Sequence, residues 1–229
     1  MQRVTLFLVV EGQSESGFFE PLLAAHLGAL GIDLSVPVIG KGNAKGGMMF
    51  RSFSDVCREL GNFLADRWRP IVTTFFDYYG FPETTRLGWD FIAATKSQRG
   101  APGLEARLHE GVLATGPDAG DRFIPYVQMH ELEALYFAEP TVFAEVLEAP
   151  ALSPQLERIA AAAGGCEAIN DSPTTAPSKR LAQLCAYKKG RSSAAHAPRL
   201  GKRMTLARVR EACPRFAAWL TRLEALAPG

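Results

Sequence analysis

The chain has 229 residues, a hydrophobic content of 47% and a formal net charge of +1 at neutral pH, which suits one large domain with a sizeable core. No apolar run approaches the roughly 20 residues of a membrane span, and no charged-then-apolar signal pattern opens the chain. The four cysteines are scattered without metal-ligand spacing, so we expect free thiols, a cytoplasmic protein and no membrane partner.

The first predicted strand, residues 5–10, is a short apolar run typical of a strand buried on both faces of a parallel sheet. It delivers Glu11 to a turn at Gly12, and open α/β sheets bind their ligands at the carboxyl ends of such strands. Apolar residues at three- and four-residue spacing predict a helix over 15–30, with Ser14 as its N-cap. A solvated acid at a strand end is the simpler interpretation of this stretch alone.

A second strand is predicted over 34–39, and a glycine-rich loop containing Lys41 follows it. The loop lacks the Gly-Lys-Ser/Thr ending of a phosphate-binding P-loop, but Lys41 is a candidate contact to a phosphate backbone. A helix over 54–64 leads to the third strand, residues 71–76, which ends in Asp77. This strand therefore repeats the arrangement of the first, an apolar run that delivers an acid to a turn.

Two successive strand–helix units make a parallel sheet with right-handed crossovers the expected topology. In such a sheet Glu11 and Asp77 project from the same edge. We therefore predict an α/β fold with a mostly parallel four-stranded sheet flanked by helices.

Residues 81–102 are predicted to be an excursion over this edge, and a helix is predicted over 104–113. The fourth strand, residues 122–129, contains Pro125, which favours an edge or bulged position. The chain then reaches a third acidic strand exit. The side chains at this exit that can transfer a proton or bind a metal are His130, Glu131 and Glu133. Ala134 stands where a zinc-protease helix needs a histidine, so that motif is excluded.

The last third of the chain is expected to be helical, over about 141–147, from about 177, and over about 205–226. We predict an α/β core over 1–140 and a helical basic region over 141–229 packed on it. Through residue 177 there are 13 Lys and Arg against 22 Asp and Glu, whereas residues 178–222 have 12 against one. This excess of positive charge predicts that the segment binds a polyanion such as DNA or RNA. The candidate contacts are Lys179, Arg180, Lys188 and Lys189. The alternative is a basic face that pairs with the acidic body of the same protein.

Carboxylates that converge on one sheet edge repel one another unless a cation lies between them. Mg²⁺ (or Mn²⁺) suits this position, because it takes oxygen ligands and keeps waters for a substrate phosphate. The candidate metal ligands are Glu11, Asp77, Glu131 and Glu133. Such an ion would activate water and neutralise charge at phosphorus, so the acids together predict a nuclease site. The alternative is that these carboxylates are ordinary solvated side chains at the edge of the sheet.

Two short segments carry a resemblance to a known fold. Val10 to Gly12 followed by Glu15, together with Phe76 to Gly80, resembles the Toprim domain of topoisomerases, primases and overcoming-lysogenization-defect nucleases. Across nearly the whole chain, four segments look like a Toprim-like bacterial family of unknown function. They are residues 73–80, 123–137, 169–180 and 213–219.

The Toprim resemblance implies that Glu11 acts as general acid or base and that Asp77 holds the metal. Tyr79 stands where the Toprim pattern has a second Asp, so Glu131 or Glu133 would have to supply that ligand. His130 would then orient a ligand or protonate a leaving oxygen, or else serve as a structural hydrogen-bonding residue. The resemblance also implies an anti-phage or DNA-repair setting with an AAA- or ABC-type ATPase partner.

Two other interpretations stay open from the sequence. One is a non-catalytic subunit that docks on an ATPase, and the other is a nucleic-acid-binding module without chemistry. A homodimer is compatible with all three interpretations.

Overall fold

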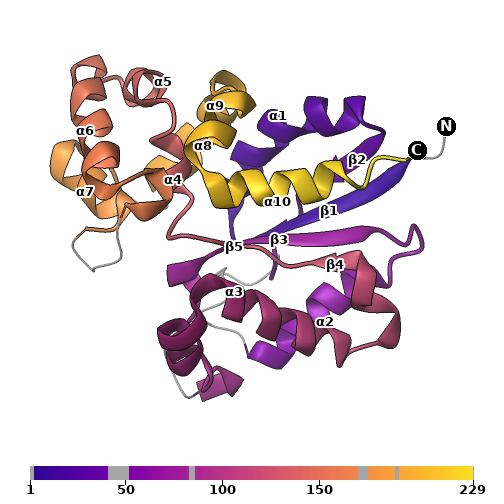
Figure 1. Ribbon diagram of the computed structural model, residues 1–229. Helices are drawn as coiled ribbons and strands as arrows, with labels where there is room; N and C mark the ends of the chain where they lie inside the picture. The colour runs from indigo at the N-terminus through magenta and orange to yellow at the C-terminus, as the bar shows by residue number, and fades with distance from the viewer. Residues whose placement is uncertain (1–2, 41–51, 83–85, 170–174, 189–190, 229) are drawn as a thin grey trace. The chain divides into compact units, whose positions relative to one another are not determined.

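The computed structural model describes residues 3–40, 52–82, 86–169, 175–188 and 191–228 (Figure 1). The chain divides into two compact units. The sheet unit comprises Met1–Gly12, Leu27–Val127 and Leu226–Gly229, and the helical unit comprises Gln13–His26 and Gln128–Ala225. The predicted boundary at residue 140 stays a prediction. No described helix is long and apolar enough to cross a membrane.

The sheet is parallel, as predicted. β1 (Val4–Val10) pairs with both β2 (Ile32–Ser35) and β3 (Ile71–Asp77), and β3 pairs with β4 (Phe123–Ile124). The strand order is β2-β1-β3-β4, with the short β5 (Val127–Gln128) also paired to β3. The predicted fold class, α/β with a parallel sheet of four to five strands flanked by helices, is confirmed.

The central strands are apolar because they are buried on both faces. Leu8, Val9 and Val10 of β1 have no exposed surface. The fourth strand predicted over 122–129 is instead two short strands separated by Pro125 and Tyr126. Proline has no N–H for a ladder bond, and the hydroxyl of Thr74 takes over part of the pairing by bonding both the N–H and the carbonyl of Tyr126.

Two helices lie together on one side of the sheet within the sheet unit (Figure 1). They are α2 (Phe53–Leu64) and α3 (Ile92–Leu113). The side chain of Ser52 caps α2 by accepting the N–H of Asp55 at 3.0 Å, so the helix begins earlier than the sequence predicts. α3 is much longer than the predicted 104–113 and is broken at Gly100, whose φ of 60° belongs to the left-handed region.

α1 (Gln13–Ala29) begins directly after Gly12, which is its N-cap, and no side-chain bond from Ser14 caps it. The rest of the helical unit comes from the C-terminal half of the chain. Its helices are α4 (Glu133–Tyr136), α5 (Pro140–Val146), α6 (Ser153–Ala163), α7 (Pro177–Leu184), α8 (Arg191–Arg203), α9 (Leu206–Ala212) and α10 (Pro214–Glu224).

The core of the helical unit is aromatic. The ring of Phe18 meets that of Tyr136 at 5.2 Å, and the ring of Phe19 meets Trp219 at 6.2 Å and Phe216 at 6.4 Å. All five side chains have 2% of their surface exposed or less. Phe216 and Trp219 of α10 are therefore core residues, and Phe18 and Phe19 of α1 pack in the same core.

The four cysteines are free thiols, as expected. Those of Cys166 and Cys213 are hydrogen-bonded to each other, and this bond and burial raise the pKa of the Cys213 thiol. The neighbouring carboxylate of Glu167 accepts the N–H groups of Arg215 at 2.8 Å and Phe216 at 3.0 Å. Glu167 therefore caps the N-terminus of α10, which begins at Pro214 rather than continuing the preceding helix.

Candidate functional site

Two of the predicted acids are in contact in the sheet unit. Glu11 follows the last residue of β1, and Asp77 is the last residue of β3. Oε1 of Glu11 accepts the backbone N–H of Asp77 at 2.8 Å. Asp77 is buried and Glu11 is half-buried. The carboxylate of Glu11 is therefore held beside the residue that carries the second carboxylate.

The parallel register explains this contact. Val10 is the partner of Phe75, so β1 and β3 end at nearly the same level. The strand order β2-β1-β3-β4 reverses direction between β1 and β3. In open α/β sheets, ligands bind at such a reversal, outside the carboxyl ends of the strands. Glu11 and Asp77 stand at this place.

Gly80 makes room for the carboxylate of Glu11. A Cβ atom at position 80 would lie 2.5 Å from Oε1 and 2.7 Å from Oε2 of Glu11, closer than real Cβ contacts. Because glycine has no Cβ, the turn after β3 can approach the acid this closely. A side chain at the last position of the Phe76-to-Gly80 motif would therefore clash with Glu11, which explains the glycine there.

A lysine that the sequence did not single out contacts the turn that follows Asp77. Nζ of Lys96, on α3, is 4.6 Å from the ring centroid of Tyr78, the residue after Asp77. Lys96 is half-buried. Its separation from Asp77 along the chain and the lack of any motif around it explain why sequence reasoning missed it.

The other two predicted acids are buried in the helical unit, where each accepts hydrogen bonds. Oε2 of Glu131 accepts the N–H of Ser178 at 2.9 Å, and its Oε1 accepts the Ser178 hydroxyl at 3.1 Å. Oε1 of Glu133 accepts the hydroxyl of Tyr187 at 2.9 Å. Nδ1 of the buried His130 lies 3.2 Å from the carbonyl oxygen of Ile169.

The hydrogen bond from Ser178 to Glu131 fixes the start of a helix in the basic segment. Ser178 is the second residue of α7, so the carboxylate of Glu131 caps the positive end of that helix. The next two residues are the candidate nucleic-acid contacts Lys179, which is exposed, and Arg180, whose Nε donates to the carbonyl of Thr175. Glu131 therefore fixes the helix end that presents these cations.

Among the remaining candidate contacts, Lys188 is exposed. Lys41 and Lys189 lie outside the described residues, as does the glycine-rich loop around Lys41.

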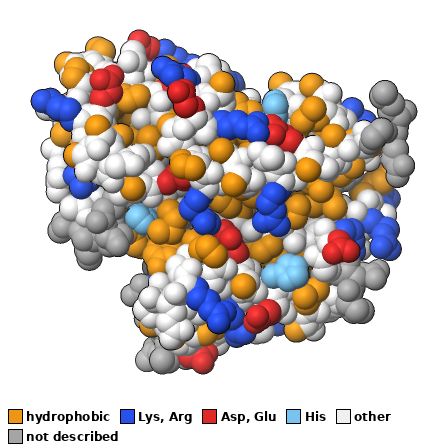
Figure 2. Space-filling view, in the orientation of Figure 1, with side chains coloured by type: hydrophobic (Ala, Val, Ile, Leu, Met, Phe, Trp, Pro, Cys, Tyr) orange, Lys and Arg blue, Asp and Glu red, His pale blue; other side chains and the backbone are white. Residues whose placement is uncertain are grey.

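Several arginines of the basic segment pair with acids of the same unit. Arg203 pairs with Glu145, Arg199 with Glu148 at 3.4 Å, and Arg208 with Glu211 at 2.9 Å. Figure 2 shows basic and acidic side chains next to each other over the helices of this unit. For these arginines, pairing within the protein is what the structure shows.

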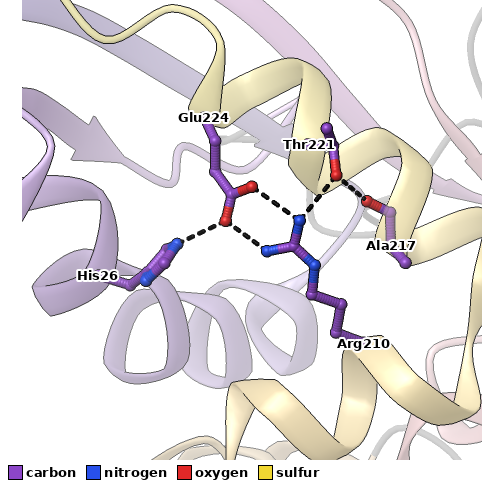
Figure 3. Close-up of polar contacts among 5 residues, drawn as sticks. All are labelled: His26, Arg210, Ala217, Thr221 and Glu224. Atoms are coloured by element: carbon purple, nitrogen blue, oxygen red, sulfur yellow. Dashed lines mark hydrogen bonds and ion pairs between the residues drawn. The ribbon is translucent and has the colours of Figure 1, made fainter.

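A tighter network joins three helices of the helical unit (Figure 3). Nη1 and Nη2 of Arg210 donate to the two oxygens of Glu224 at 2.6 and 2.9 Å, and Nε2 of His26 lies 2.7 Å from Oε1. Hydrogen bonding from Arg210, with that from His26, holds the pKa of the Glu224 carboxyl below its ordinary value. This network is structural, since it ties the end of α10 to α1 and α9.

The acidic pair can be tested for its fit to a divalent ion. Across the described residues, no three His, Cys, Asp or Glu side chains form a group that could hold a metal. Mg²⁺ does not require three protein ligands, because it is often bound by one or two carboxylates, waters and substrate phosphates. Glu11 and Asp77 are ligands of this kind, and an ion held by both stays a prediction. Glu131 and Glu133 as metal ligands stay a prediction.

A family described as "Domain of unknown function (DUF4276)" matches residues 10–224. The chain belongs to the DUF4276 family. The prediction of a family of unknown function is thus confirmed, and the match includes both Glu11 and Asp77. No curated protein and no solved structure matches the chain. The kinship of this DUF4276 protein to Toprim domains stays a prediction.

Proposed function

We propose that this DUF4276 protein is a Mg²⁺- or Mn²⁺-dependent nuclease that hydrolyses phosphodiester bonds in DNA or RNA. The observation that supports it most is the hydrogen bond between the carboxylate of Glu11 and the N–H of Asp77. It joins two acids at the reversal point of a parallel sheet, where such sheets bind their ligands.

In this proposal Glu11 and Asp77 hold the metal ion. The Asp77 N–H orients the carboxylate of Glu11, and Gly80 leaves space for it, so that little rearrangement is needed when the ion binds. The chemistry that such an ion supplies is charge neutralisation at phosphorus and activation of a water molecule. Glu11 is also the proposed general acid or base.

The helical unit contributes binding in this proposal. Lys179, Arg180 and Lys188 contact substrate phosphates, with Glu131 fixing the end of α7 that carries the first two. An ATPase partner and an anti-phage or DNA-repair setting belong to the same proposal. Roles for His130 and Glu133 in the reaction also remain proposals.

The deciding experiment is a cleavage assay with labelled DNA and RNA in the presence of Mg²⁺ or Mn²⁺. We expect Asp77→Ala and Glu11→Gln to lose cleavage while circular dichroism and unfolding temperature stay close to those of the wild type. Glu110→Gln is the matched control, because Glu110 is exposed and pairs with Arg107 in the same unit. Undiminished cleavage by Asp77→Ala would remove the metal-site proposal.

A non-catalytic nucleic-acid-binding subunit is the second candidate. It is favoured by the hydrogen bonds that Glu131 and Glu133 make to Ser178 and Tyr187, because these give both acids structural roles. Tyr79 in place of a second acid points the same way. Such a subunit would bind nucleic acid with a steep salt dependence and with the same affinity with and without Mg²⁺.

A further inference from the structure

Lys96 contacts the residue that follows Asp77 in the chain. Its ammonium lies 4.6 Å from the ring centroid of Tyr78. Tyr78 follows Asp77 directly, and the N–H of Asp77 is bonded to Glu11. Lys96 therefore contacts the turn at the carboxyl end of β3, directly after the residue whose N–H is bonded to Glu11.

An aromatic cluster fixes the segment that carries Lys96 relative to the segment that carries Asp77. Phe76 and Phe81 flank the turn after β3, and their rings are 6.4 Å apart. Phe81 meets the buried Trp89 at 6.0 Å, and Phe53 of α2 meets both Trp89 at 5.2 Å and Phe91 at 4.9 Å. Phe91 is the residue before α3. The position of Lys96 is thus set by packing.

The break in α3 separates this part of the helix from the rest. Gly100, with its φ of 60°, ends the first two turns of α3, so Lys96 lies on a short helical piece aimed independently of residues 101–113. The ring of Tyr78 attracts the ammonium by a cation–π interaction, which holds the charge without neutralising it. Lysine in such a place is a common point-charge ligand for phosphate.

We infer that Lys96 contacts the substrate phosphate that lies next to Glu11 and Asp77. The inference rests on the proposed function for the identity of the substrate, a phosphodiester of a nucleic acid. Two carboxylates balance the charge of one Mg²⁺, so a lysine on the neighbouring turn adds attraction for the negative phosphate that the metal and the acids together do not supply. Lys96 acts in binding and orientation, not as a metal ligand.

The test measures binding separately from cleavage. Fluorescence anisotropy of a short labelled DNA or RNA is recorded with Ca²⁺ in place of Mg²⁺, over a series of salt concentrations. We expect Lys96→Gln to weaken binding about tenfold and to reduce the slope of log affinity against log salt by about one. Lys96→Arg is expected to keep the charge and most of the affinity.

Arg58→Gln is the matched control, because it removes one positive charge from the same unit at an exposed position paired with Asp55. It should leave the affinity and the salt slope unchanged. Equal affinity of Lys96→Gln and the wild type would overturn the inference.

The variant Tyr78→Leu tests whether the role of Lys96 is purely structural. If the lysine only fastens α3 to the turn, Tyr78→Leu and Lys96→Gln should lower the unfolding temperature and the affinity alike, with the salt slope unchanged, and the inference fails. If Lys96 contacts phosphate, Tyr78→Leu keeps the salt slope of the wild type and Lys96→Gln lowers it by about one. A wild type that binds but never cleaves, with the Lys96 effect intact, would refute the nuclease proposal alone.

Discussion

At the scale of single residues, the close approach of Gly80 to Glu11 offers a way to disturb the site without removing an acid. Gly80→Ala would place a methyl group within 2.7 Å of both carboxylate oxygens. The flexible glutamate side chain must then swing away from the Asp77 N–H. We expect a loss of cleavage of about 100-fold, measured as kcat/KM, and weaker Mn²⁺ binding in calorimetry.

Gly28→Ala is the control for this substitution, because a Cβ at position 28 meets no atom within 4 Å. It should cleave like the wild type. If Gly80→Ala also cleaves like the wild type, then the observed position of the Glu11 carboxylate has no part in the reaction.

The residue scale also shows how far sequence reasoning reaches into the site. The contact between Glu11 and Asp77 was foreseeable, since parallel strands that end in acids bring them to one edge. Lys96 was not foreseeable, because its contact with Tyr78 depends on the aromatic packing of α2, α3 and the turn after β3. The hydrogen bonds of Glu131 and Glu133 were equally hidden, since their partners Ser178 and Tyr187 are 47 and 54 residues away along the chain.

At the scale of secondary-structure elements, the ion pair of Arg210 and Glu224 makes the joining of α9, α10 and α1 dependent on pH. The pKa of Glu224 is lowered in the folded state, mainly by hydrogen bonding to Arg210. Its contribution to the free energy of unfolding is therefore present above the unfolded-state pKa, near 4.5, and is lost as the pH falls through the folded-state value. Urea unfolding at neutral pH and below pH 4.5 measures this loss.

We expect the wild type to lose more unfolding free energy over that pH interval than Glu224→Gln, whose side chain does not titrate. Glu211→Gln serves as the control, because Glu211 forms an exposed pair with Arg208 and such pairs contribute little. Parallel pH profiles for the wild type and Glu224→Gln would contradict the assigned role of Glu224.

Elements also differ in how well the sequence predicts them. β1 and β3 were predictable, since short runs of apolar and β-branched residues strongly favour buried strands. α8 was not, because it contains Pro198 and Gly201 and shows no clear apolar period. Its stability depends on tertiary contact instead: a Cβ on Gly201 would lie 2.2 Å from the carbonyl oxygen of Phe18 in α1. Phe18, which lies 183 positions earlier in the chain, thus leaves no room for a side chain at position 201.

At the scale of the whole molecule, metal binding should be visible as thermal stability. A ligand that binds only the folded protein at ten times its Kd adds about 1.4 kcal/mol, which raises the unfolding temperature of a chain of this size by about 3–5 °C. We expect Mn²⁺ to produce this rise in the wild type and chelation to reverse it. The measurement is differential scanning fluorimetry.

Glu11→Gln should unfold at nearly the same temperature as the metal-free wild type and show no rise with Mn²⁺. An equal rise in this variant would mean that the ion binds elsewhere on the protein.

The two units are interleaved along the chain, and this has a consequence for biosynthesis. α1 is translated before its packing partners, because Phe19 packs on Phe216 and Trp219, which follow it by about 200 residues. Domains usually fold in order as they emerge, the N-terminal one first. Here the apolar face of α1 stays uncovered until the residues of α10 have been translated, so nascent chains would carry an exposed apolar surface.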